Sequence, residues 1–328
     1  MNQVIRVYLF LALIIIIVIG FNILVIFNKG FMVRMPDIIK KASKIDPIWN
    51  EIKDKNGISC NEKKFGCFFN KNSKKNIFIL GDSTIAALLE DLILEINKYD
   101  QYNIHTLTQG GCPFLIGFGF QDKKNKDISS CNFDYIQNVI NKINKYNNSI
   151  VIYGAAYNIY LNEYLSFKKK DRVIKKEITT IPVSNGKFKT IKISLFETIK
   201  SLSANNKVIL IYPIPEIGYN VKNALLNKYL RNKKKSNMID IDDQITVSYD
   251  FYKIKQKEAF EILDSIKNKN IYRVYPHEVF CNNLIKNKCV THDKKNIFFY
   301  DGFHLSNTGS KMVNKLILDK IKLIENVN

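Results

Sequence analysis

A serine, an aspartate and a histidine lie in two short segments at opposite ends of the chain. Ser83 ends a Gly-Asp-Ser tripeptide that directly follows the apolar run 76–80, and a helical pattern begins behind it. Near the C-terminus, Asp301 precedes His304 by three residues, in a turn ahead of the last helical pattern. A serine whose proton is taken by a carboxylate-oriented histidine is a nucleophile toward acyl groups. The sequence therefore predicts acyl chemistry by a Ser83, His304 and Asp301 triad.

Each half of this set also has a plain structural explanation. Asp82 or Ser83 could cap the following helix, because Asp and Ser are both favoured at the N-cap position. His304 could be a packed histidine beside a helix, and Asp301 a turn residue. The presence of both halves, in this order and at the two ends of one domain, favours the catalytic interpretation.

Two further segments could donate hydrogen bonds to the oxyanion that forms when a serine attacks a carbonyl carbon. The segment TQGGCPFL follows the second predicted strand, and glycine allows the backbone to approach a ligand closely. We therefore expect Gly110 or Gly111 to donate a backbone N–H beside that of Ser83, although a plain turn is the alternative. After the third predicted strand, Asn158 either reaches the oxyanion hole or caps a helix.

Short apolar runs alternate with helical patterns along the body of the chain and must position these residues. The runs lie at 76–80, 103–107, 149–153, 207–212 and 271–275, and the main helical patterns at 84–97, 132–146, 190–204, 246–268 and 307–325. Almost wholly apolar strands alternating with helices predict a parallel sheet covered on both faces, in a three-layer α/β/α doubly wound fold. Such sheets bind ligands beyond the carboxyl ends of their strands, where Ser83 is expected.

The first 28 residues predict a membrane anchor. Between Arg6 and Asn28 the chain has 21 uncharged residues, enough for a helix to cross a hydrocarbon core of about 30 Å. No small-residue cleavage site follows, so an uncleaved transmembrane signal anchor fits better than a removed signal peptide. Residues 29–75 are then expected to form a stalk or linker with a Cys loop, and residues 76–328 the catalytic domain.

The six cysteines all follow the apolar segment and fall into three close pairs. These disulfide candidates are Cys60 with Cys67, Cys112 with Cys131, and Cys281 with Cys289. An even number in local pairs suits an oxidising compartment. A metal site is the weaker alternative, because there is no CxxC spacing and no interleaved histidine.

The charges around the apolar segment predict the opposite topology. One basic residue, Arg6, precedes the segment, whereas five lie between Lys29 and Lys44, which by the positive-inside rule would keep the body in the cytoplasm. We give the cysteines more weight and expect an extracytoplasmic body. The formal net charge of +20 comes without a nucleic-acid-binding motif, so we expect no nucleic-acid partner.

The serine and histidine segments together resemble the SGNH hydrolase superfamily, which carries a GDS serine early and a DxxH block late in the domain. The likeness covers residues 76–325 and is closest to the SGNH domains of acyltransferase family 3 proteins, which acylate surface polysaccharides. TQGGCPFL and the cysteine in CNNLIKNKCVTH strengthen it. One departure is that the asparagine of the superfamily would fall at Ala156, and Asn158 is displaced from it by two residues.

The resemblance implies a serine-dependent O-acyltransferase, of the O-acetyl type, that modifies cell-envelope polysaccharide. Expected partners are an acylated glycan or acyl donor, a multi-span membrane acyltransferase, and the bacterial inner membrane that holds the anchor. A carbohydrate O-acyl esterase has the same triad and differs only in passing the acyl group to water. A non-catalytic glycan-binding or assembly protein is the alternative of another class. No metal or redox cofactor is implied.

Overall fold

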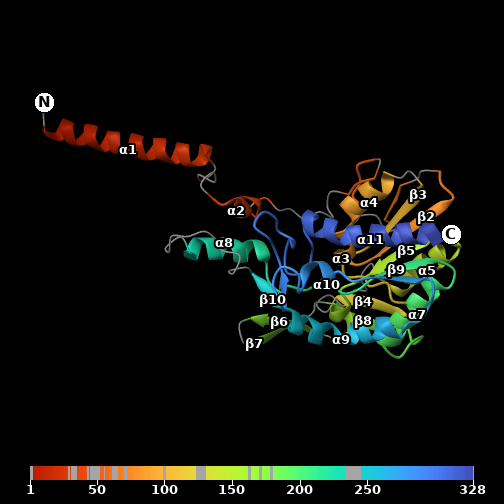
Figure 1. The fold of residues 1–328 in the computed structure, drawn as a ribbon. Coiled ribbons are helices and arrows are strands. Elements are labelled where there is room, and N and C mark those ends of the chain that lie inside the picture. The colour runs from red at the N-terminus through yellow and green to blue at the C-terminus, as the bar shows by residue number, and fades with distance from the viewer. Residues whose placement is uncertain are drawn as a thin grey trace.

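The computed structural model contains a long N-terminal helix, α1 (Gln3–Phe27), followed by an α/β body (Figure 1). It describes residues 3–28, 30, 35–42, 44, 52–54, 56–60, 66–69, 72–98, 101–122, 131–161, 164–169, 172–177, 180–232 and 245–327. Helix α1 is uniformly apolar apart from its first turns, and none of its residues is buried against the body. Its mean hydropathy and length are those of a membrane-crossing helix.

A six-stranded sheet forms the centre of the body, in the order β1-β3-β2-β5-β9-β11. Its strands are β1 (Cys67–Phe69), β2 (Lys75–Gly81), β3 (Tyr102–Thr108), β5 (Ile150–Gly154), β9 (Lys207–Ile211) and β11 (Ile271–Val274). All are parallel except β1, which pairs antiparallel with β3. Numbered along the chain, the parallel strands have the order 2-1-3-4-5, that of a flavodoxin-like doubly wound sheet. The predicted fold class is confirmed.

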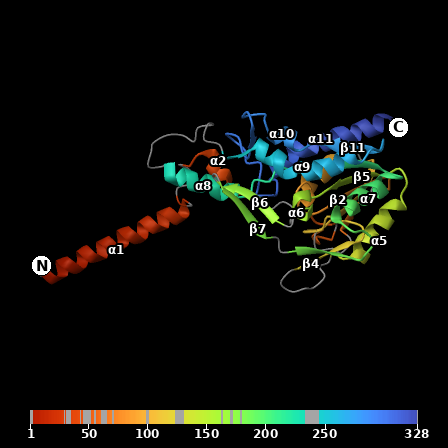
Figure 2. The same ribbon diagram turned by 90° about the horizontal axis from the view of Figure 1, so that it is seen from below.

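The sheet separates two hydrophobic cores. Alternate side chains of β2 point to opposite faces, so that Ile77 and Ile79 enter one core and Phe78 and Leu80 the other, all fully buried. Helices α4 (Leu89–Asn97) and α11 (Asn307–Val327) cover the first face, and α5 (Phe133–Asn144), α7 (Ile191–Ser203) and α9 (Tyr249–Ser265) the second. These helices flank the sheet on its two sides in Figures 1 and 2.

Two elements before residue 76 pack against the body. Helix α2 (Asp37–Ala42) buries Ile38 and Ile39 and packs against α8 (Val221–Asn232). Strand β1 adds an edge to the central sheet. Packed elements therefore lie within the segment expected to be a stalk or linker.

Short elements connect or flank the layers. They are α3 (Ser83–Ala86), α6 (Tyr157–Leu161), α10 (His277–Phe280), and the antiparallel pairs β4 (Phe118–Asp122) with β8 (Thr180–Ser184), β6 (Tyr164–Lys169) with β7 (Arg172–Glu177), and β10 (Thr246–Ser248) with β12 (Lys288–Val290). The helical pattern at 84–97 is divided into α3 and α4, and the pattern at 246–268 begins as β10. Most of the Lys-rich stretch at 231–235 lies outside the described residues.

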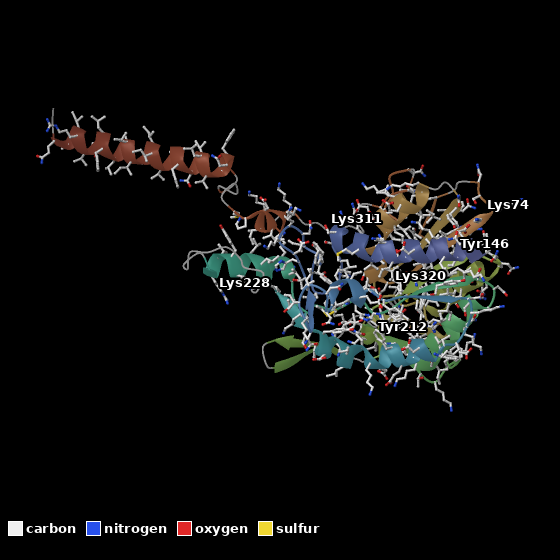
Figure 3. The ribbon with its side chains drawn as sticks, in the orientation of Figure 1. Lys74, Tyr146, Tyr212, Lys228, Lys311 and Lys320 are labelled. Atoms are coloured by element: carbon white, nitrogen blue, oxygen red, sulfur yellow. A yellow bond between two sulfur atoms is a disulfide. The ribbon has the colours of Figure 1, made fainter. Side chains whose placement is uncertain are left out.

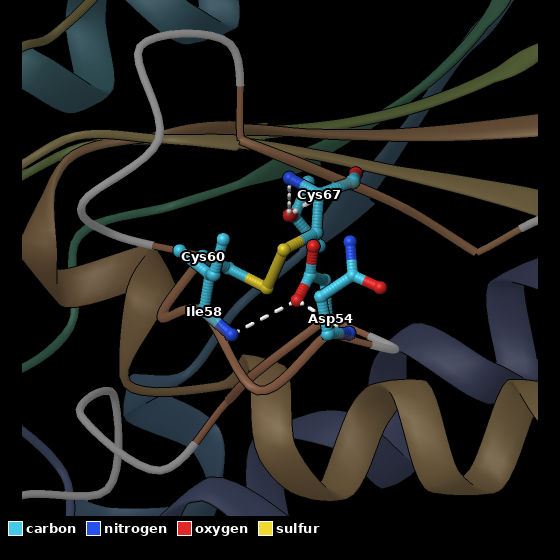
Figure 4. The surroundings of a disulfide bond; sticks show 6 residues. Asp54, Ile58, Cys60 and Cys67 are labelled. Atoms are coloured by element: carbon cyan, nitrogen blue, oxygen red, sulfur yellow. Dashed lines mark hydrogen bonds between the residues drawn. A yellow bond between two sulfur atoms is a disulfide. The ribbon is translucent and has the colours of Figure 1, made fainter.

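All three predicted disulfides are formed. The Cys60–Cys67 bond closes the loop before β1, beside a turn in which Asp54 accepts a hydrogen bond from the Ile58 N–H (Figure 4). The other two join the segment after β3 to the start of α5, and the end of α10 to β12. Together with α1, these bonds support a membrane-anchored domain outside the cytoplasm.

Lysines lie on several elements of the body. Figure 3 labels Lys74 before β2, Lys228 on α8, and Lys311 and Lys320 on α11.

Candidate active site

Ser83 begins α3 at the carboxyl end of β2, where the strand order reverses between β2 and β5. Gly81 and Gly154 are register partners on these strands. A Cβ at Gly81 would lie 2.2 Å from the Gly154 carbonyl oxygen, and one at Gly154 would lie 2.7 Å from Ile85 Cδ1. Both glycines are therefore needed for α3 to pack directly on the strand ends, which places Ser83 at the ligand-binding edge of the sheet.

Asp82 is the N-cap of α3, and it also binds the segment after β5. One carboxylate oxygen accepts hydrogen bonds from the Thr84 N–H (2.9 Å) and the Thr84 hydroxyl (2.6 Å). The other accepts from the Ala156 N–H (2.8 Å) and the Tyr160 hydroxyl (3.0 Å). The side chain is only 1% exposed. The capping role follows from the residue type, whereas the bonds to Ala156 and Tyr160 have no local signal in the sequence.

His304 lies between Ser83 and Asp301. Its Nε2 is 2.9 Å from Ser83 Oγ, and its Nδ1 is 2.8 Å from Asp301 Oδ2. The three residues predicted from opposite ends of the chain are thus brought into one hydrogen-bonded series. With the Nδ1 proton directed to the carboxylate, Nε2 is free of a proton and can accept that of the serine hydroxyl.

The turn that carries Asp301 and His304 is fixed by its own backbone and by the loop after β9. Asp301 Oδ1 accepts the N–H groups of Phe303 (2.7 Å) and His304 (2.8 Å). The Gly302 carbonyl accepts the N–H groups of Ile217 (2.8 Å) and Gly218 (3.1 Å). The backbone that carries the histidine is therefore fixed both by the Asp301 side chain and by the loop after β9.

The Asp301 carboxyl has a lowered pKa. Burial raises the pKa, but the hydrogen bond and charge of His304 and the backbone N–H donors lower it by more. Because folding lowers this pKa, the carboxylate stabilises the fold above its ordinary pKa, and this contribution is lost as the pH falls through the lowered value.

Two buried polar side chains of α11 donate hydrogen bonds to backbone carbonyls between α3 and α4. The Ser310 hydroxyl donates to the Ala87 carbonyl (2.7 Å), and the Asn314 amide donates to the Leu88 carbonyl (3.0 Å). Because α11 follows the His304 turn directly, these bonds connect the histidine segment to the serine segment.

A model of the family described as SGNH domain (fused to AT3 domains) matches residues 54–319. This chain belongs to the SGNH family. It is an SGNH-type enzyme of the acyltransferase and ester hydrolase class. No curated protein matches the chain. Among solved structures, the periplasmic domain of the lipopolysaccharide acetyltransferase of Salmonella ser. Paratyphi A is similar, at 20% identity with a TM-score of 0.48, over 75% of this chain and 83% of that domain.

The glycines predicted to border the oxyanion hole of this SGNH enzyme lie in an exposed turn. The Gln109 N–H donates to the Gly81 carbonyl (3.0 Å), and the turn closes where the Cys112 N–H donates to the Gln109 carbonyl (3.1 Å). Gly111 has a φ of +70°, a conformation that favours glycine at the third position of a type II turn. The turn is therefore fixed beside the strand end that leads to Ser83.

Asn158 lies in α6 and is only 3% exposed. It is not at the tip of the loop after β5, where the Ala156 N–H instead binds Asp82. The tyrosines next to Asn158 along the helix, Tyr157 and Tyr160, are also buried. Burial, and next the charge of Asp82, raises the pKa of Tyr160 well above its ordinary value, which keeps its hydroxyl a donor.

The remaining histidines do not join the Ser83 series. His105 lies in β3 and stacks on Phe78, with ring centroids 4.3 Å apart. His292 is buried, and its Nδ1 lies 3.0 Å from the Asp293 carbonyl oxygen. Within the described ranges, no group of His, Cys, Asp and Glu side chains has the arrangement of a metal site.

Proposed function

We propose that this chain is a serine-dependent O-acyltransferase that modifies a cell-envelope polysaccharide, with acetyl as the expected acyl group. The observation that carries the proposal is the series Asp301–His304–Ser83, with contacts of 2.8 and 2.9 Å at the strand ends. Membership of a family whose domains are fused to AT3 domains supports transfer over simple hydrolysis.

In the proposed mechanism, Ser83 Oγ attacks the acyl carbonyl carbon of an ester or thioester while His304 Nε2 takes its proton. Asp301 stabilises the resulting imidazolium through Nδ1. His304 then gives the proton to the leaving group, and an acyl-enzyme remains. In the second half, a sugar hydroxyl loses its proton to His304 and attacks the acyl carbon, and Ser83 recovers its proton. Backbone N–H groups of Ser83 and of Gly110 or Gly111, with Asn158 as a further candidate, would bind the oxyanion.

We propose a multi-span membrane acyltransferase of the same envelope as the donor, and the bacterial inner membrane as the site of the α1 anchor. The family description, with its AT3 fusion, supports a partner of this kind. An esterase of the same fold is the second candidate, because water can replace the sugar hydroxyl at the acyl-enzyme.

The first test is mass spectrometry of the full chain in detergent after incubation with an activated aryl acetate. We expect an acetyl adduct on Ser83 and turnover of the ester, both lost in Ser83→Ala, by a factor of about 10³ or more. A folded chain that gives neither adduct nor turnover would favour the non-catalytic glycan-binding alternative. Formation of acetylated glycan rather than free acetate separates the transferase from the esterase.

A further inference from the structure

A buried ion pair joins the loop after β9 to helix α9. The Glu216 carboxylate pairs with Lys255 Nζ, and the two side chains are only 7% and 6% exposed. The same carboxylate accepts a hydrogen bond from the Gln256 amide (3.0 Å), which is buried as well. Removing two charges from water is costly, and apolar residues of similar size often serve stability equally well. Stability alone is therefore a weak reason for this pair.

Glu216 lies beside the candidate active site. It lines a small cavity together with Thr84, Ala156 and Phe303. Thr84 follows Ser83, and Phe303 precedes His304. The cavity is thus lined by Glu216 and by chain neighbours of both Ser83 and His304.

The position of Glu216 is fixed relative to His304. The next two residues along the chain, Ile217 and Gly218, donate their N–H groups to the Gly302 carbonyl, in the turn that carries His304. On the other side, the Tyr252 hydroxyl donates to the Pro213 carbonyl (2.7 Å). A group bound to Glu216 would therefore lie at a fixed distance and orientation relative to His304.

The carboxylate has capacity for a further hydrogen bond. An ionised carboxylate offers about four acceptor positions, and among the described residues Lys255 and Gln256 donate to it. Lys255 also balances the charge of Glu216, so the carboxylate does not place a net negative charge beside a developing oxyanion.

We propose that Glu216 is the acceptor-binding residue of this site, for an acceptor with several hydroxyl groups, such as a sugar. Its carboxylate accepts a hydrogen bond from one hydroxyl and thereby directs a neighbouring hydroxyl toward His304 Nε2. The attacking hydroxyl loses its proton to His304, its oxygen bonds to the acyl carbon, and the bond to Ser83 Oγ breaks. Glu216 neither gains nor loses a proton. This inference rests on the proposed acyl transfer and names its acceptor side.

The test measures how the acyl-enzyme divides between water, methanol and polyhydroxylated acceptors. The full chain in detergent is acylated with an aryl acetate in the presence of methanol, glycerol or a set of methyl glycosides. The variant is Glu216→Gln combined with Lys255→Met, which removes both charges of the pair. The control is Glu261→Gln with Lys257→Met, an exposed ion pair on the same helix.

We expect the buried-pair variant to lose roughly tenfold in transfer to the best polyol, the effect of one hydrogen bond to a charged group. Acylation of Ser83, hydrolysis and transfer to methanol should stay within about twofold, because none of them uses a second hydroxyl. The control variant should match the wild type.

Three results would overturn the inference. They are an equal loss for methanol, water and polyol, an unchanged polyol rate, and a wild-type enzyme that prefers no polyol over methanol. Absence of any acyl-enzyme in the wild type would instead count against the proposed function itself, so the two failures are distinguishable.

Discussion

The two sides of the candidate site are built from different kinds of group. On one side, Ser83, His304 and Asp301 contribute side chains joined by hydrogen bonds of 2.9 and 2.8 Å. On the other side, the candidate oxyanion donors are backbone N–H groups in the turn at Gly110 and Gly111. The chemistry of a side chain follows from its residue type. A backbone N–H group becomes a donor to the site only through the path of the folded chain.

Asp82 joins the serine to a third part of the site. Its two oxygens bind Thr84 on α3 and Ala156 after β5, at the point where the strand order reverses. Since Tyr160 also binds it, a single buried carboxylate fixes the serine relative to the loop after β5. The side-chain series and the two glycines have signals in sequence motifs, whereas this connection has none.

Among substitutions that keep Ser83, the largest effect on the side-chain side is expected from Asp301→Asn. The amide preserves shape but favours the wrong histidine tautomer, so acylation of Ser83 should fall by about 10⁴-fold. The rate of aryl acetate turnover measures this, with the thermal unfolding midpoint as the check on folding. A loss of only a few fold would remove Asp301 from the series.

A smaller loss is expected on the backbone side from Gly110→Pro. Proline is favoured at the second position of a type II turn, so the turn at 109–112 should be retained while the N–H is removed. We expect acylation to fall by about 100-fold, the effect of one oxyanion donor. Gln109, the residue before Gly110, is bound to the Gly81 carbonyl.

The same assay measures the acylation rate of this variant, and circular dichroism checks that it is folded. An unchanged rate with an intact fold would remove the Gly110 N–H from the oxyanion hole.

The smallest of the three effects is expected from Asp82→Asn, which tests the connection between the serine and the loop after β5. The new amide group meets hydrogen-bond donors at Ala156 or Tyr160, so we expect a loss of about 2 kcal/mol in the free energy of unfolding and of roughly tenfold in acylation. Urea denaturation and the aryl acetate assay measure these. Asp319→Asn, on the exposed side of α11, serves as the control. A wild-type acylation rate would show that acylation does not depend on this connection.

The sheet and the side-chain series were predictable because their signals are local. Runs such as 77–80 and 208–211 are buried on both faces and are apolar along their length. The break between α3 and α4 was not predictable, because its carbonyls are bound by Ser310 and Asn314, which lie more than 200 residues away along the chain. The roles of Asp82 and Glu216 were missed for the same reason.

Helix α2 limits how far the body can move from α1. Figures 1 and 2 both place α2 and α8 at the end of the body nearest α1, and α8 follows β9 at the carboxyl edge of the sheet. Between Phe27 and Asp37 the chain can span roughly 35 Å even when fully extended. With α1 in a bilayer, this short tether confines the reacting groups to a thin layer above the lipid. The proposed donor in the same membrane would then be met within this layer, at a rate set by the surface density of the two proteins.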